Sequence, residues 1–249
     1  MKIDTHCHLS KKEYANLDEI IKHMENDIIV CSGASMEDNE STLELVSKYS
    51  NIYGTIGFHP DEIYNVDESS FAYLEDNISN KKIVGIGEIG LDYYHDGDKI
   101  KQQDLFIKQL ELARKYNMPV VIHSRDAASD TYDILKKYSD LKIIMHCYSY
   151  SLEMAYKFVE LGCKLGIGGV LTFKNGKKLV EVVENIDIEN LVLETDSPYL
   201  TPEPYRGMQN EPYNITLVAK KIAELKGISV EKVYEVTTKN ACEIYGIKL

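Results

Sequence analysis

The sequence lacks the features that mark membrane-spanning, secreted and disulfide-stabilised proteins. No apolar run approaches the ~18 residues that a membrane-spanning helix needs, and no basic segment followed by an apolar stretch suggests a secretory signal. The five cysteines are scattered and form no C-x-x-C pair, which argues against a disulfide framework and against a cysteine-based zinc site. We therefore expect a cytoplasmic protein with reduced thiols and no membrane partner.

Positive charge is also scarce. The chain has 28 basic and 40 acidic residues, a formal net charge of -12, and no visible basic stripe of the kind that grips duplex nucleic acid. If the substrate is a polyanion, its charge has to be neutralised locally. A bound metal pair could do this, because metal ions are often the largest charges in a site.

Short apolar runs rich in β-branched residues alternate with longer amphipathic stretches, with no linker and no obvious sequence repeat. We expect strands in eight of these runs: 2–4, 27–33, 51–57, 82–88, 118–124, 141–147, 163–169 and 190–196. Helical spacing lies between them, for example at Leu179, Val182 and Val183. Two further helical stretches, 214–227 and 229–246, follow the last run.

This order of elements fits two α/β architectures, a single (β/α)8 TIM barrel and a doubly wound open sheet. In a barrel, catalytic side chains collect at the C-terminal ends of many strands, whereas in a doubly wound sheet they gather near one switch point. Here, polar residues with possible chemical roles end almost every predicted strand. We therefore expect one TIM barrel domain over residues 1–249, with a metal site at the C-terminal face of the strands.

Four histidines and two carboxylates occur at the ends of five predicted strands: His6, His8, Glu88, His123, His146 and Asp196. His6 and His8 are two residues apart, so both side chains can project to one face of a strand and reach one metal ion. Any one of these residues alone is more often structural than functional. Their joint occurrence around the mouth of one barrel predicts a metal site.

This set is about what two divalent cations need, and Glu88 is available to bridge them. Imidazole-rich ligation suits zinc, manganese, cobalt or iron better than magnesium, although the carboxylates leave magnesium open. His59 ends the third predicted strand and could face the same mouth as a substrate ligand. Residues 85–90 also match G-x-G-x-x-G, but we reject a dinucleotide site because a polar loop at 91–98, and no helix, is expected to follow.

Together these residues resemble the TatD-type metal-dependent deoxyribonucleases, a branch of the amidohydrolase-like barrels. The resemblance covers nearly the whole chain, and its motifs occur in family order: DTHCHL, GFHP, GEIGLDYY, PVVIHSRDA, MHCYS, GGVLTF, LETDSPYLTPEPYRG and NEP. It implies that the metal ligands are His6, His8, Glu88, His123, His146 and Asp196. It further implies that Glu88 bridges two ions (Mg²⁺, Mn²⁺ or Zn²⁺) and that Asp196 takes a proton from the attacking water.

The same resemblance implies hydrolysis of phosphodiester bonds in DNA, often by trimming single strands from the 3′ end. Arg125 and Arg206 are our candidates for holding the phosphate, because a guanidinium group matches phosphate oxygens with two hydrogen bonds. Salt bridges at the surface or between loops are the alternative. The family commonly has a basic residue after the RG of YRG, where this chain has Met208, so one possible phosphate contact is missing. Rim aromatics such as Tyr94 and Phe173 could stack on bases or simply pack.

Other functions stay open at this point. The same barrel could hydrolyse another ester or an amide, such as a lactone, a cyclic amide or an aminoacyl ester on transfer RNA. The absence of a lysine at the bridging position favours the nucleases. A non-catalytic metal-binding protein would have lost the proton acceptor or several ligands, and a purely structural barrel would bind no metal. We expect a monomer, because no long apolar stripe is left over for a second subunit.

Overall fold

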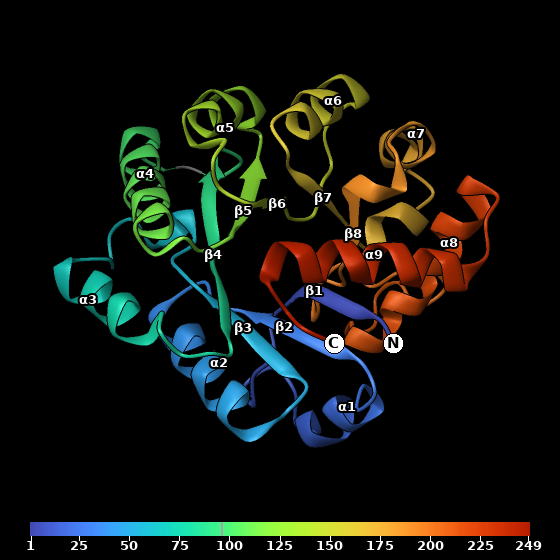
Figure 1. The fold of residues 1–249 in the computed structure, drawn as a ribbon, viewed down its shortest axis with the longest axis horizontal. Coiled ribbons are helices and arrows are strands. Elements are labelled where there is room, and N and C mark those ends of the chain that lie inside the picture. Colours follow the sequence, from blue (N-terminus) through green and yellow to red (C-terminus); the bar gives the residue numbers. More distant parts are fainter. Residues whose placement is uncertain (96) are drawn as a thin grey trace.

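Eight parallel strands form the centre of the computed structural model, which describes residues 1–95 and 97–249. The strands are β1 (Ile3–Cys7), β2 (Ile28–Ser32), β3 (Ile52–Ile56), β4 (Ile83–Asp92), β5 (Val120–Arg125), β6 (Ile143–Met145), β7 (Lys164–Ile167) and β8 (Leu191–Leu193). Each strand pairs with the next one along the chain, so the sheet runs from β1 to β8 in sequence order. The sheet curls into a nearly closed (β/α)8 TIM barrel, which confirms the predicted fold (Figure 1).

Helices follow the strands and cover the outside of the barrel (Figure 1). They are α1 (Leu17–His23), α2 (Met36–Lys48), α3 (Glu68–Asn77), α4 (Lys99–Tyr116), α5 (Ala128–Leu135), α6 (Leu152–Glu160), α7 (Lys177–Asn185), α8 (Ile215–Lys226) and α9 (Val230–Tyr245). Local sequence explains their ends: in α4, the Asp98 side chain accepts hydrogen bonds from the first backbone N–H groups, and Asn117 ends the helix at a φ of 52°. Among the described residues, no helix is both long and apolar enough to cross a membrane.

Apolar side chains pack in two clusters, one on each side of the strands. The outer cluster lies between the strands and the surrounding helices and includes Cys7, Ile86 and Ile89. The inner cluster lies at the N-terminal end of the barrel, where strand residues such as Ile3 and Val84 contact α9. Helix α9 crosses the centre of the ring of strands in Figure 1. It closes this end of the barrel, so the polar site lies at the opposite, C-terminal end.

A β-bulge on β1 turns His6 toward the barrel interior. Between Asp4 and Cys7, β1 has two residues where the facing strand β2 has one. Under strict alternation, Ile3 and Cys7 would face the same side of the sheet. Ile3 instead packs in the inner cluster and Cys7 in the outer one, because the extra residue shifts the alternation by one. His6 therefore points inward next to the outward-facing Cys7.

A second bulge on β4 does the same for Glu88. Between Ile86 and Ile89, β4 has two residues where β5 has one. Both isoleucines pack in the outer cluster, although residues three apart on a regular strand face opposite sides. Regular alternation from Ile86 would have turned Glu88 outward. The bulge turns it into the barrel, which is the use that bulges beside functional sites commonly have.

The seam between β8 and β1 is closed by hydrogen bonds from Asp4 and from the loop after β8. The Asp4 carboxylate accepts a hydrogen bond from the Thr195 N–H at 2.9 Å and another from the Thr195 hydroxyl at 2.5 Å. The Asp196 N–H donates to the His6 carbonyl at 3.0 Å. The first and last strands of the barrel are thereby held together at the end that carries the predicted ligands.

The first and fourth strands extend beyond their predicted ends, whereas the sixth, seventh and eighth end two or three residues before theirs. The first strand was expected to end at residue 4 but continues to Cys7, and the loop expected at 91–98 begins later because β4 pairs with β5 through Asp92. The added residues 5–7 and 89–92 mix polar, glycine and apolar residues, and the bulge in each strand breaks the regular alternation from which strand ends are predicted. Helix α4 begins only at Lys99, so no helix follows the glycine motif directly.

Asp4→Ala is expected to destabilise the fold, because it removes the acceptor of two buried hydrogen bonds from Thr195. An unpartnered buried polar group costs about 1–3 kcal/mol, so the unfolding free energy measured in urea with chelator should fall by that order. Asp4→Asn, which keeps an acceptor oxygen, should lose less. Glu153→Ala on the exposed face of α6 is the control and should keep the wild-type midpoint. An unchanged midpoint for Asp4→Ala would contradict its role at the seam.

Candidate metal centre

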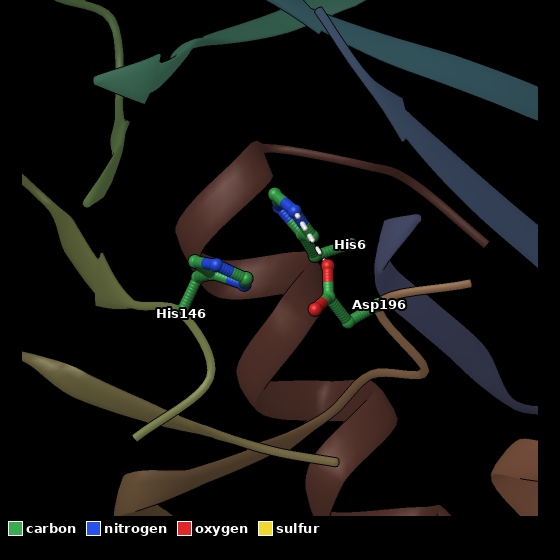
Figure 2. A group of neighbouring side chains, drawn as sticks. All are labelled: His6, His146 and Asp196. Atoms are coloured by element: carbon green, nitrogen blue, oxygen red, sulfur yellow. Dashed lines mark ion pairs between the residues drawn. The ribbon is translucent and has the colours of Figure 1, made fainter. Parts of the chain in front are cut away.

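All six side chains predicted as metal ligands meet at the C-terminal end of the barrel. They come from β1 and the residue after it, from β4 and β5, and from the segments that directly follow β6 and β8. Figure 2 shows three of them, His6, His146 and Asp196, pointing toward one another from separate parts of the chain. Their convergence is a property of the fold, while their roles as ligands stay predictions.

Glu88 lies in the middle of this group, and its two carboxylate oxygens face different imidazoles. Oε2 is 3.6 Å from Nε2 of His6 and 3.4 Å from Nε2 of His8. Oε1 is 2.7 Å from Nδ1 of His123 and 3.1 Å from Nε2 of His146. We call His6 and His8 the first pair and His123 and His146 the second pair. A carboxylate divided in this way has the arrangement of a ligand that bridges two cations.

Asp196 approaches the first pair from the loop after β8. Its Oδ1 lies 3.6 Å from Nε2 of His6, the ion pair dashed in Figure 2. The same atom lies 3.7 Å from Nε2 of His8. The Asp196 backbone has a φ of 55°, in the left-handed region that aspartate tolerates better than most residues. With its N–H bonded to the His6 carbonyl across the seam, this turn fixes the carboxylate beside the first pair.

Burial and charge give Glu88 and His6 the charge states that metal binding requires. Burial by itself raises the pKa of Glu88, but the imidazoles of His146 and His123 outweigh burial and hold this pKa well below its usual range. Burial lowers the pKa of His6 well below its usual value, and the neighbouring His146 lowers it further. At neutral pH, Glu88 is therefore an anion and His6 a neutral imidazole.

Asp196 and His8 differ from these two groups in proton affinity. Burial raises the pKa of Asp196 to about 6, so its carboxylate accepts a proton more readily than that of an exposed aspartate. Burial lowers the pKa of His8, but the nearby carboxylates of Glu88 and Asp196 outweigh burial and raise it to about 9. Before a metal ion binds, the His8 imidazole consequently carries a proton at pH 7.

The donor atoms fit divalent transition metals. The first pair with Glu88, and the second pair with Glu88, each form a group whose ligand atoms lie within 4.8 Å of one another. A further such group joins Asp196 to His6 and His146. The Nε2 atoms of His6 and His8 are only 3.1 Å apart and both approach the same carboxylate oxygen. Mixed imidazole and carboxylate donors of this kind suit zinc, manganese, iron and cobalt.

Two of the three residues predicted to contact substrate line the cavity over this centre. The cavity has a volume of about 660 Å³, and its walls include His59 and Arg125. Arg125, at the end of β5, lies with its guanidinium carbon 3.7 Å from the centre of the Tyr94 ring. Arg206 is not among the described residues that line the cavity, and its guanidinium carbon lies 3.7 Å from the centre of the Phe173 ring. The predicted phosphate contact of Arg206 at the metal centre therefore has no support from its position.

Two buried carboxylates beside the centre are missing from the predicted site. Oδ2 of Asp92 lies 3.0 Å from Nε2 of His123, and Oε1 of Glu194 lies 3.4 Å from Nδ1 of His146. A signal for each was present in the sequence. Asp92 follows Glu88 by four residues, and Glu194 precedes Asp196 by two at the end of an apolar strand. A charged residue that directly continues a buried strand has to find a partner inside the fold.

Residues 3–246 match the sequence model of a family described as TatD related DNase. The chain is 38% identical to YabD of Bacillus subtilis, with 99% of this chain and 100% of that protein covered. It is also 38% identical to MJ1582 of Methanocaldococcus jannaschii, with 99% and 98% covered. Both relatives are named uncharacterized metal-dependent hydrolases. The crystal structure of YJJV, a TatD homolog from Escherichia coli K12, has a TM-score of 0.89 and 27% identity, with 99% and 98% of the two chains covered.

Divalent-metal affinity is expected to rise with pH between 7 and 8.5. His8, with its pKa at about 9, has to lose its proton to bind a cation, and so does His146, where burial lowers the pKa but Glu88 and Glu194 outweigh burial and raise it. The affinity should therefore rise at least tenfold per pH unit over this range. Below pH 6, where Asp196 also becomes protonated, the affinity should fall more steeply. Calorimetric titration with Mn²⁺ under anaerobic conditions from pH 5.5 to 8.5 measures this dependence.

His8→Ala should lower the slope above pH 7 by about one proton, because one of the protons that metal binding displaces is then absent, while His146 still has one to lose. His23→Ala, at an exposed position on α1, is the matched histidine control and should keep the wild-type slope. An affinity that does not change between pH 7 and 8.5 in the wild type would show that His8 is not a ligand that loses a proton.

Proposed function

We infer that this chain, which belongs to the TatD-related DNase family and is a metal-dependent hydrolase, cleaves phosphodiester bonds of DNA with two divalent ions. The observation that carries this proposal is the division of the Glu88 carboxylate between the two imidazole pairs, with Asp196 beside the first pair. The first pair, the second pair, Glu88 and Asp196 would hold the two ions (Mg²⁺, Mn²⁺ or Zn²⁺), which when bound would supply the Lewis acidity that activates a water molecule and offsets charge on the phosphate.

Asp196 is the proton acceptor in this proposal. Attack of water on phosphorus forms one P–O bond and breaks another, and the proton released by the water moves to the Asp196 carboxylate. Its pKa, raised by burial to about 6, suits a general base that works near neutral pH. Glu88 stays ionised and holds the two halves of the site together. His59, whose Nε2 is 4.0 Å from the Glu88 carboxylate, is our second candidate for a substrate contact.

Positive charge available for a phosphate is limited around the cavity. Lys11 lines the cavity but is paired with Glu44 at 2.5 Å. Lys12 lines it as well and is paired with Glu37 at 3.0 Å. Arg125, whose flat guanidinium group can donate two hydrogen bonds to one phosphate, is therefore our candidate for the direct contact. The divalent ions supply the remaining positive charge that a chain with a net charge of -12 needs to hold a polyanion.

Exposed aromatic rings support a substrate with unpaired bases. Tyr199 lines the cavity with 56% of its surface exposed, and its ring centre lies 6.2 Å from that of His8. Tyr94, stacked against Arg125, is 60% exposed. Such rings can stack on bases of single strands, whereas the bases of a duplex are already stacked on each other. We therefore favour single-stranded DNA and 3′ ends as substrate.

His6→Ala and Asp196→Ala are expected to abolish metal-dependent cleavage of a labelled single-stranded oligonucleotide. The first change removes a ligand, and the second removes the proton acceptor, which typically contributes about 10²–10⁴-fold. The assay measures kcat after chelator treatment and addition of Mg²⁺, Mn²⁺ or Zn²⁺, with bound metal counted in the same samples. His23→Ala should keep the wild-type kcat. Cleavage that persists in either site variant would contradict the assignment.

The choice of substrate is tested on the same preparation with DNA strands blocked at the 3′ or the 5′ end, single-stranded RNA, a lactone and an aminoacyl ester. We expect unblocked DNA to shorten from its 3′ end and a 3′ block to stop the reaction. Hydrolysis of the lactone or the aminoacyl ester, together with intact DNA, would overturn the nuclease assignment in favour of another ester hydrolase on the same metal centre.

Arg125→Ala is expected to raise KM for a dinucleotide by about tenfold or more, because a hydrogen bond to a charged group contributes about 1.5–3 kcal/mol. Arg206→Ala is the matched arginine control. Because Arg206 lies outside the cavity, the Arg206→Ala variant should keep the wild-type KM for the dinucleotide. Its KM should rise only for longer strands that reach past the rim. If Arg125→Ala and Arg206→Ala raised KM for the dinucleotide equally, the position of Arg125 in the cavity would not explain its role.

A further inference from the structure

We propose that Asp92 and Glu194 are positioning residues, each of which orients one imidazole of the second pair for metal binding. The inference rests on the two-ion centre of the proposed function and is independent of the DNA substrate. It concerns the nitrogen of each imidazole that faces away from Glu88. The partner of that second nitrogen decides which nitrogen carries the hydrogen and how the ring is oriented.

The two ring nitrogens of His123 face different carboxylates, one on the inner side of the site and one behind it. Its Nδ1 lies 2.7 Å from Glu88, on the inner side of the site, and its Nε2 lies 3.0 Å from Oδ2 of Asp92. If Nε2 carries the hydrogen and donates it to Asp92, the lone pair of Nδ1 is directed at the shared carboxylate. Asp92 is itself fixed, because it is buried and its Oδ1 accepts a hydrogen bond from the Tyr94 N–H at 2.9 Å.

Glu194 has the corresponding place behind His146. Its Oε1 accepts a hydrogen bond from the Cys147 N–H at 2.6 Å and lies 3.4 Å from Nδ1 of His146. On the inner side, Nε2 of His146 is 3.1 Å from Glu88. Nδ1 of His146 and Oε2 of Glu194 are both buried without a hydrogen-bond partner among the described residues. The Glu194 carboxylate, with Oε1 3.4 Å away, is thus an available acceptor for a hydrogen on Nδ1 of His146.

The fold keeps space for the Glu194 carboxylate. The side chain is fully buried, and the neighbouring residue on β7 is Gly166, where an added Cβ would lie 2.1 Å from Oε2 of Glu194. A buried carboxylate is costly unless a cation or a charged hydrogen-bond donor balances it. His146, whose proton is shared with Glu194 when a metal ion holds Nε2, is the donor within reach.

Among the residues that the structure places, no carboxylate stands behind the first pair in this way. Nδ1 of His8 lies 3.0 Å from the carbonyl oxygen of Ser32, a neutral acceptor. Nδ1 of His6 has no partner among the residues that the structure describes. Strand β4 and the segment that follows β8 thus each supply two acidic residues with different tasks. Glu88 and Asp196 face the ions, whereas Asp92 and Glu194 stand behind the second pair. Carboxylates in this outer position typically change metal affinity by 10–100-fold.

The test is an equilibrium titration of the metal-free protein with Mn²⁺. The EPR signal of free Mn²⁺ measures how much of the ion is unbound, and the signal of a spin-coupled pair measures how much protein holds two ions. Asp92→Asn and Glu194→Gln keep the shape of each side chain and an acceptor oxygen but remove the charge. We expect each variant to bind one Mn²⁺ with wild-type affinity and the other 10–100-fold more weakly. The spin-coupled pair should then form only at higher Mn²⁺.

Asp130→Asn is the matched control. The Asp130 carboxylate accepts hydrogen bonds from Tyr93 and Gln103, close to β4, and from no histidine among the described residues. The Asp130→Asn variant should therefore bind both Mn²⁺ ions with wild-type affinity. Thermal unfolding in chelator distinguishes a local effect from a damaged fold, because the positioning variants should keep the wild-type Tm without metal and lose only part of the increase that Mn²⁺ produces.

Unchanged affinities for both ions in Asp92→Asn and Glu194→Gln would overturn the inference, as would an equal loss of both ions together with a lowered Tm in chelator. A wild type that binds a single Mn²⁺ would overturn the inference along with the two-ion centre. A wild type that binds two Mn²⁺ but leaves DNA intact would overturn the nuclease assignment only. The two proposals can therefore fail separately.

Discussion

The rest of the site depends on the interaction between the buried carboxylate of Glu88 and the four imidazoles around it. A carboxylate removed from water is stable as an anion only if positive or hydrogen-bonding groups surround it. Here, the first pair faces one of its oxygens and the second pair faces the other, and their influence on its pKa outweighs burial. The imidazoles are themselves buried around this one charge. Protons and metal ions therefore compete for the same positions, and the site is built as one electrostatic unit.

The architecture of the barrel confines this charge to one end. Apolar strand residues and α9 fill the N-terminal end of the interior, and a larger apolar cluster lies between the strands and the outer helices. The polar ends of the strands are left to form the cavity. The seam between β8 and β1 adds a second constraint, because the hydrogen bonds between Asp4 and Thr195 hold Asp196 beside the first pair. Closure of the barrel and assembly of the site are thus the same structural event.

The proposed substrate, DNA, is a polyanion, whereas the chain itself has a formal net charge of -12. The lysines that line the cavity are already paired with glutamates, and Arg125 is held against Tyr94. In the proposed reaction, positive charge would therefore come mainly from ions held at the base of the cavity, where charges act over short distances in a medium of low dielectric constant. Positive charge concentrated at the base of the cavity favours a substrate that inserts one end into it over a substrate that lies along a charged groove.

The sequence by itself determined the alternation of strands and helices, the class of the fold and the histidines at the strand ends, because these depend on local periodicity and residue type. The tertiary structure decided which of these side chains meet. Two bulges shift the alternation of β1 and β4 and so turn His6 and Glu88 inward, and a bulge exists only where two strands pair. Likewise, Glu194 and Asp92 acquire partners, and Arg206 lies outside the cavity, through contacts between segments far apart in the chain. Local patterns carry no information about such contacts.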